Sequence, residues 1–109
     1  MANQNVIEIT DGNFDEQVMN SSQPVLVDFT AEWCPPCKLL APTIDKLAND
    51  YTNRVKVGKI DIDANRNVTL RFQVSSIPTV IVFKDGQMRQ KFVGLKKEAD
   101  LKAALDSVL

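Results

Sequence analysis

The chain alternates strand-like runs with helix-like repeats over its whole length, and this alternation limits its fold more than any other feature. Apolar or alternating runs rich in Val, Ile and Phe predict strands at residues 6–10, 25–29, 55–63, 79–83 and 90–93. Apolar residues repeated at intervals of three or four predict helices at residues 12–20, 34–51, 67–74 and 96–109. This order predicts one α/β domain over residues 1–109, with a central mixed five-stranded sheet flanked on both faces by four helices.

Short sequence motifs predict local features of these elements: the start of one helix, a kink in another and a hairpin turn. Asn13 and Glu16 have the spacing of a capping box and predict the start of the first helix. Pro42 lies inside the second helix and should kink it, because proline lacks a backbone donor and crowds the preceding turn. Asp85 and Gly86 form a turn dipeptide between the last two strands, which therefore predict a hairpin.

The composition excludes several classes of function. The sequence contains no histidine, so hydrolases with an imidazole base and zinc sites with histidine ligands are ruled out. The net charge of −1 provides no basic excess for nucleic acid. The first residues lack a secretory signal, and no run approaches the roughly 20 apolar residues of a membrane span. We therefore expect a cytoplasmic protein that binds neither nucleic acid nor membranes. We also expect a monomer that holds no metal and no cofactor of its own, although these two expectations do not follow from composition.

The only two cysteines, Cys34 and Cys37, lie at the start of the second predicted helix. If Cys34 is the N-cap, Pro35 takes the first helical position, where a missing N–H costs nothing. The Cys34 sulfur can then accept a hydrogen bond from the Cys37 N–H, and the helix dipole favours its thiolate. An exposed, acidic Cys34 beside a more buried Cys37 suits thiol–disulfide exchange, in which Cys34 attacks a target disulfide and Cys37 resolves the mixed disulfide.

Two structural interpretations of this pair stay open. A structural zinc site takes four ligands, so a single pair of thiolates would need a second copy of the chain. Two inert buried cysteines are the other alternative, although Trp33 and the two prolines are typical of an exposed loop edge. A permanent disulfide staple is disfavoured because the cytoplasm is reducing.

The segment VDFTAEWCPPCKLLAP, residues 27–42, resembles the active-site segment of the thioredoxin family. The resemblance continues through TDGNF, VGKIDID, SSIPTVIVFKDG and the closing FVG, in the family's order. It implies a protein disulfide reductase with the thioredoxin fold. It also implies protein disulfides as substrates and a thioredoxin reductase, a flavoprotein that draws on NADPH, as the electron donor. By the same resemblance Cys34 is the nucleophile and Cys37 the resolving thiol.

The resemblance implies further site residues. It matches Asp28 to a buried carboxylate behind the cysteines, Lys59 to a lysine near that carboxylate, and Pro78 to a cis-proline packed against the disulfide. It also implies a shallow apolar groove that binds an extended substrate segment through backbone hydrogen bonds. The substrate-binding residues would be Trp33, Pro35, Pro36, Ile77, Pro78, Val93 and Gly94. A residue of any of these kinds, taken alone, more often has a plain packing role.

Asp28 carries a signal of its own. It interrupts the apolar run 25–29, which is typical of a strand in the middle of a sheet. A carboxylate there is costly unless its ionisation is suppressed or useful. With no histidine in the chain, Asp28 is the natural proton acceptor for Cys37. The alternative is a carboxylate at a strand end that pairs with a lysine.

Two residues depart from the family pattern and leave the finer function open. Pro35 stands where the family usually has glycine, and Thr30 where it commonly has an aromatic residue. Pro35 removes an N–H beside the sulfur and, because it precedes Pro36, is biased away from helical angles. Redox potential and substrate choice therefore stay open. The alternatives to a reductase are a thioredoxin-fold binding module with incidental thiols and an oxidase or isomerase variant.

Overall fold

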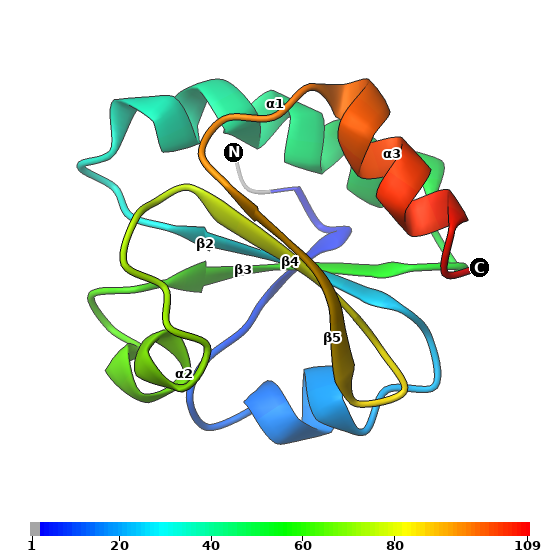
Figure 1. Ribbon diagram of the computed structural model, residues 1–109, viewed down its shortest axis with the longest axis horizontal. Coiled ribbons are helices and arrows are strands. Elements are labelled where there is room, and N and C mark those ends of the chain that lie inside the picture. Colours follow the sequence, from blue (N-terminus) through cyan, green and yellow to red (C-terminus); the bar gives the residue numbers. More distant parts are fainter. Residues whose placement is uncertain (1–2) are drawn as a thin grey trace.

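The computed structural model describes residues 3–109, which form one five-stranded sheet between two layers of helices (Figure 1). The strand order in the sheet is β1-β3-β2-β4-β5. Strands β1, β3 and β2 are parallel, whereas β4 is antiparallel to both β2 and β5. Their bounds are β1 (Val6–Glu8), β2 (Val25–Thr30), β3 (Lys56–Asp61), β4 (Thr79–Lys84) and β5 (Gln87–Val93). The predicted mixed sheet, with its second strand in the middle, is confirmed.

Helices cover both faces of this sheet, as predicted. Helices α1 and α3 lie on one face, and the π-helix η1 and α2 lie on the other (Figure 1). Their bounds are η1 (Asp15–Met19), α1 (Pro35–Asp50), α2 (Arg66–Arg71) and α3 (Glu98–Asp106). No helix within residues 3–109 is long and apolar enough to cross a membrane.

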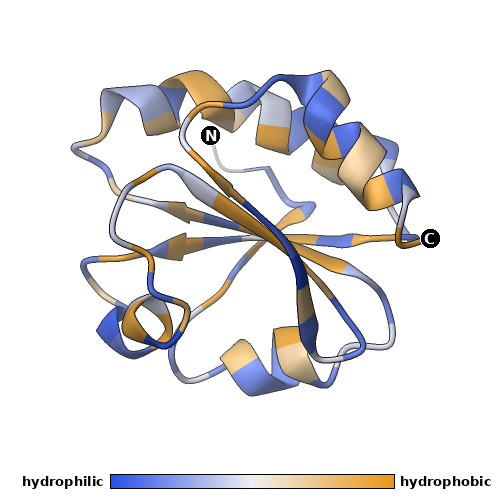
Figure 2. Cartoon of the chain, viewed as in Figure 1, coloured by the Kyte–Doolittle hydropathy of each residue, from blue (hydrophilic) through white to orange (hydrophobic). Residues whose placement is uncertain are grey.

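The side chains of β2 divide the core into two clusters. Leu26 packs into the cluster that contains residues of α1 and α3. Val25 and Val27 pack into the cluster that contains residues of η1 and α2. Side chains two residues apart on a strand point to the same face of the sheet. Asp28 therefore lies on the same face as Leu26, toward α1. In Figure 2 the central strands carry most of the hydrophobic colour, whereas the edge strand β5 is largely hydrophilic and exposed.

The start of the first helix differs from the prediction. The capping box of Asn13 and Glu16 is absent, and η1 begins at Asp15 without a side-chain cap. The Asn13 Oδ1 instead accepts a hydrogen bond from the Thr10 N–H at 2.7 Å, and its Nδ2 donates to the Glu8 carbonyl at 3.0 Å. The prediction was wrong because this short polar side chain bonds to the backbone of the preceding loop.

The hairpin and the interior proline lie where the sequence placed them. Asp85 and Gly86 have φ values of 54° and 74°, as a two-residue hairpin turn of type I′ requires. Pro42 lies within α1.

Candidate active site

Cys34 caps helix α1. Its backbone is extended, with φ −101° and ψ 103°, and its Sγ accepts a hydrogen bond from the Cys37 N–H at 3.2 Å. Pro35 and Pro36 occupy the first two helical positions, where no N–H is needed. The predicted N-cap is confirmed. The two cysteines form a disulfide with a Cα–Cα distance of 5.3 Å, as expected of a pair able to cycle between thiol and disulfide.

The predicted contrast in exposure between the cysteines is wrong for this disulfide form. Cys34 and Cys37 are each only 3% exposed. Both side chains pack with Ala31, and Ile62 and Ile77 lie against this cluster. The exposed surface at this point belongs to Trp33 and the two prolines. The disulfide bond joins the side chain of the N-cap residue Cys34 to that of Cys37 in the first turn of α1, and both side chains lie in this cluster.

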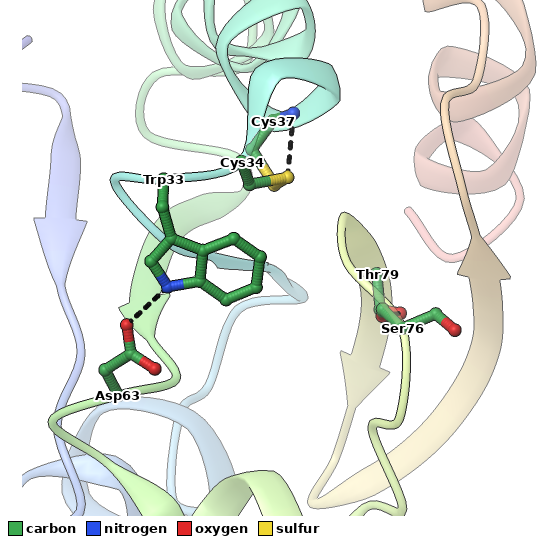
Figure 3. Close-up of a disulfide and its surroundings, with 6 residues drawn as sticks. All are labelled: Trp33, Cys34, Cys37, Asp63, Ser76 and Thr79. Carbon is green, nitrogen blue, oxygen red and sulfur yellow. Dashed lines mark hydrogen bonds between the residues drawn. A yellow bond between two sulfur atoms is a disulfide. The ribbon is translucent and has the colours of Figure 1, made fainter.

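Trp33 extends from the active-site loop and is held by a residue that the sequence did not indicate. Its indole is 64% exposed, and its Nε1 donates to Asp63 Oδ2 at 2.7 Å. Figure 3 shows this bond beside the disulfide. Asp63 lies just after β3, in the acid-rich stretch DIDAN of residues 61–65. This stretch predicts a hydrogen-bond acceptor near the end of β3, but the sequence does not indicate which donor it would bind. The bond fixes the direction of a large apolar side chain beside the cysteines.

A second loop contacts the disulfide from the other side. The Ile77–Pro78 peptide is cis, as the resemblance implied, and Ile77 packs against the cysteine cluster. The Gly94 N–H donates to the Pro78 carbonyl at 2.8 Å, and Val93 pairs with Thr79. The loop that holds Pro78 is therefore next to the end of β5. Trp33 and the 76–79 segment lie to either side of the disulfide in Figure 3. A substrate groove between them stays a prediction.

Asp28 is a buried carboxylate on the same face of the sheet as α1. Its side chain is 1% exposed, and within residues 3–109 its Oδ1 has no hydrogen-bond partner. Burial raises the pKa of Asp28 to about 7, and the positive charge of Lys59 opposes part of that rise. At neutral pH the carboxyl group can therefore either release or accept a proton.

Lys59 lies beside Asp28 but does not form an ion pair with it. The two residues are in register on the parallel strands β2 and β3. Among the ion pairs of residues 3–109, none joins these two side chains within 4.0 Å. Asp28 is also the fourth residue of β2 rather than its last. The alternative of a strand-end carboxylate paired with a lysine is therefore wrong.

The described part of the chain offers no cluster of metal ligands. No group of three Cys, Asp or Glu side chains within it is placed to hold a metal ion.

The fold is of the α/β class, and a disulfide lies at the N-terminus of helix α1 on the same side of the sheet as a buried carboxyl group. This combination is typical of a thiol–disulfide oxidoreductase. A comparison with protein families places the chain more narrowly. The family model "Thioredoxin" matches residues 5–107, and the chain belongs to the thioredoxin family. It is a thiol–disulfide oxidoreductase of the protein-disulfide reductase type.

Individual relatives resemble the chain over nearly its full length. It is 42% identical over 104 residues to a thioredoxin of Acidithiobacillus ferridurans, covering 95% of this chain and 96% of the relative. It is 45% identical over 103 residues to a thioredoxin of Mycobacterium bovis, covering 94% of this chain and 89% of the relative. A third relative is a bifunctional thioredoxin reductase/thioredoxin of Mycobacterium leprae, 45% identical over 94% of this chain but only 22% of the relative.

Proposed function

We propose that Cys34 is the attacking thiol, that Cys37 resolves the mixed disulfide, and that Asp28 accepts the proton which Cys37 loses. The observation that carries this assignment is the Cys37 N–H bonded to the Cys34 sulfur at the positive end of α1. That position favours a thiolate at Cys34. Cys34 therefore opens the target disulfide and Cys37 closes the protein's own disulfide, which releases the reduced target.

The role of Asp28 rests on burial and on the absence of another base. A general base works best when its pKa lies near the operating pH, and burial brings the pKa of Asp28 to about 7. The sequence contains no histidine to replace it. Lys59 beside it would stabilise the ionised carboxylate before the proton transfer.

The electron donor would be a thioredoxin reductase. The Mycobacterium leprae relative is named a bifunctional thioredoxin reductase/thioredoxin, which supports a direct encounter between two such partners. Protein disulfides would bind in extended form along Trp33, Ile77, Pro78, Val93 and Gly94. We place this function in the cytoplasm, in a monomer.

Reduction of insulin by dithiothreitol tests this function. We expect the protein to shorten the time before insulin precipitates, because the Cys34–Cys37 pair passes electrons to the insulin disulfides. A binding module with incidental thiols would leave the time course at that of dithiothreitol alone. Turnover with NADPH and a thioredoxin reductase then tests the proposed donor separately.

Pro35 is expected to tune the redox potential. It is exposed and takes the first position of α1, next to the Cys34 sulfur. Pro35→Gly restores an N–H there and frees the loop, and both changes alter the relative stability of thiolate and disulfide. We expect the potential to shift measurably while exchange continues, and each shift of about 30 mV corresponds to about 1.4 kcal/mol. Equilibration with a glutathione redox buffer measures it.

The matched control is Pro35→Ala, which restores the N–H without the freedom of glycine. Similar shifts in both variants would assign the effect to the N–H, and a shift in the glycine variant alone would assign it to the loop. Equal potentials in all three proteins would show that Pro35 has another purpose.

A further inference from the structure

Two loops meet beside the disulfide, one after β2 and one after β3. These parallel strands are neighbours with Thr30 in register with Asp61, and the Ile62 N–H donates to the Thr30 carbonyl at 3.0 Å just beyond them. The two loops therefore leave the sheet side by side. Trp33 belongs to the first loop and Asp63 to the second, and their side chains meet although 30 residues separate them.

The loop after β3 is fixed by its own side chains. The Asp63 N–H donates to Asp61 Oδ1 at 2.9 Å, which closes an Asx turn. Asn65 is buried; its Nδ2 donates to the Asp61 carbonyl at 3.0 Å, and its Oδ1 accepts from the Asp11 N–H at 2.9 Å. The Asp11 carboxylate accepts from two N–H groups in the first turn of α2, at 2.9 and 3.2 Å. Asp63 is therefore held in place by bonds that do not involve Trp33.

Trp33 has no comparable support. It is largely exposed and belongs to none of the core clusters of residues 3–109. An indole has one N–H and no acceptor, so the bond to Asp63 Oδ2 uses the whole hydrogen-bonding capacity of this side chain (Figure 3). At 2.7 Å to a carboxylate, it has the length of a charge-assisted bond, which is stronger than a bond between neutral groups. The orientation of the indole therefore depends on Asp63.

We infer that Asp63 is a positioning residue for protein substrates, which holds the Trp33 indole in the orientation that receives the extended segment of a target. This inference rests on the proposed function, in which targets bind along Trp33. A free indole on an exposed loop must be immobilised by each incoming target, and that immobilisation weakens binding. The bond to Asp63 fixes the indole before the target arrives.

Insulin reduction with dithiothreitol in excess, measured over a range of insulin concentrations, tests the effect on substrate binding. Asp63→Ala should raise KM about fivefold and leave kcat nearly unchanged, because the variant loses preorganisation and no reacting group. Asp63→Asn keeps an oxygen that accepts the indole N–H and should restore most of the affinity. The matched control is Glu32→Gln, which removes a negative charge at the exposed position next to Trp33 and should leave KM unchanged.

Two further readouts separate positioning from other effects. Trp33 is the only tryptophan of the chain, so its fluorescence reports on this bond directly. Time-resolved anisotropy of the oxidised proteins should show more fast indole motion in Asp63→Ala than in the wild type or Asp63→Asn. The reduced proteins should all react at the same rate with bis(2-hydroxyethyl) disulfide, which is too small to use Trp33. Slower reaction of Asp63→Ala with this probe would show that Asp63 acts on the cysteines and would overturn the inference.

A double-mutant cycle tests whether Asp63 acts through the indole. Trp33→Phe keeps an aromatic ring but removes the N–H, so adding Asp63→Ala to it should raise KM no further. An equal rise in both backgrounds would overturn the inference, and so would an unchanged KM in Asp63→Ala alone. A wild-type protein that failed to accelerate insulin reduction would instead overturn the proposed function, so the two failures are distinguishable.

Discussion

Cys34→Ser is expected to abolish protein disulfide reduction, whereas Cys37→Ser is expected to trap substrates as stable mixed disulfides. Serine at position 34 can still cap α1, because its oxygen accepts the same N–H that the Cys34 sulfur now accepts at 3.2 Å. The fold should therefore persist while the attacking sulfur is lost. Without Cys37, the mixed disulfide on Cys34 forms but has no internal thiol to resolve it.

Insulin reduction and mass spectrometry of trapped adducts measure these two results. We expect Cys34→Ser to give the rate of dithiothreitol alone and Cys37→Ser to accumulate an adduct with the target. In the reduced wild-type protein, iodoacetamide should modify Cys34 before Cys37. Faster modification of Cys37, together with adducts that accumulate in Cys34→Ser, would reverse the two roles.

Asp28→Asn is expected to stabilise the protein at pH 8 by an amount of the order of 4 kcal/mol. Burial raises the pKa of Asp28 from 3.8 in the unfolded chain to about 7 in the folded one. The folded protein therefore holds this proton more tightly than the unfolded protein does. The free energy of unfolding consequently falls as pH rises from 3.8 to about 7, by about 1.4 kcal/mol for each pH unit. Above that range the loss is complete, and asparagine removes it.

Denaturant unfolding of the oxidised proteins at pH 4 and pH 8 measures this effect. The advantage of Asp28→Asn over the wild type should be small at pH 4, which is close to the unfolded-state pKa of 3.8, and large at pH 8, above the folded-state pKa of about 7. A variant that is less stable than the wild type at pH 8 would show that the carboxylate contributes favourable contacts instead.

The same substitution should slow catalysis. Resolution requires Cys37 to lose its proton, and a general base typically contributes a factor of the order of a hundred or more. We expect mixed disulfides to persist correspondingly longer in Asp28→Asn. Asp45→Asn is the control for turnover, because Asp45 on α1 also has a buried oxygen without a partner among residues 3–109 but is not on β2. Equal rates of mixed-disulfide resolution in the wild type, Asp28→Asn and Asp45→Asn would show that Asp28 does not accept the proton of Cys37.

The order of the elements, the hairpin turn and the cap of α1 could all be predicted from the amino-acid sequence alone. These features depend on neighbouring residues, such as Asp85 with Gly86, or Cys34 followed by a proline at the first helical position. The apolar run of β2 also placed that strand in the middle of the sheet, because a strand covered on both faces has few polar positions. Asp28 is the one charged residue in that run.

Contacts between groups far apart in the chain could not be predicted and are seen only in the folded structure. The register of β2 against β3 sets Lys59 beside Asp28 without an ion pair, and the loop after β3 brings Asp63 to the Trp33 indole. The burial of Cys34 likewise depends on how the start of α1 packs against Ala31, Ile62 and Ile77. Such contacts join residues far apart in the chain, so local propensity and periodicity do not specify them; they follow from side-chain volumes and strand register in the packed fold.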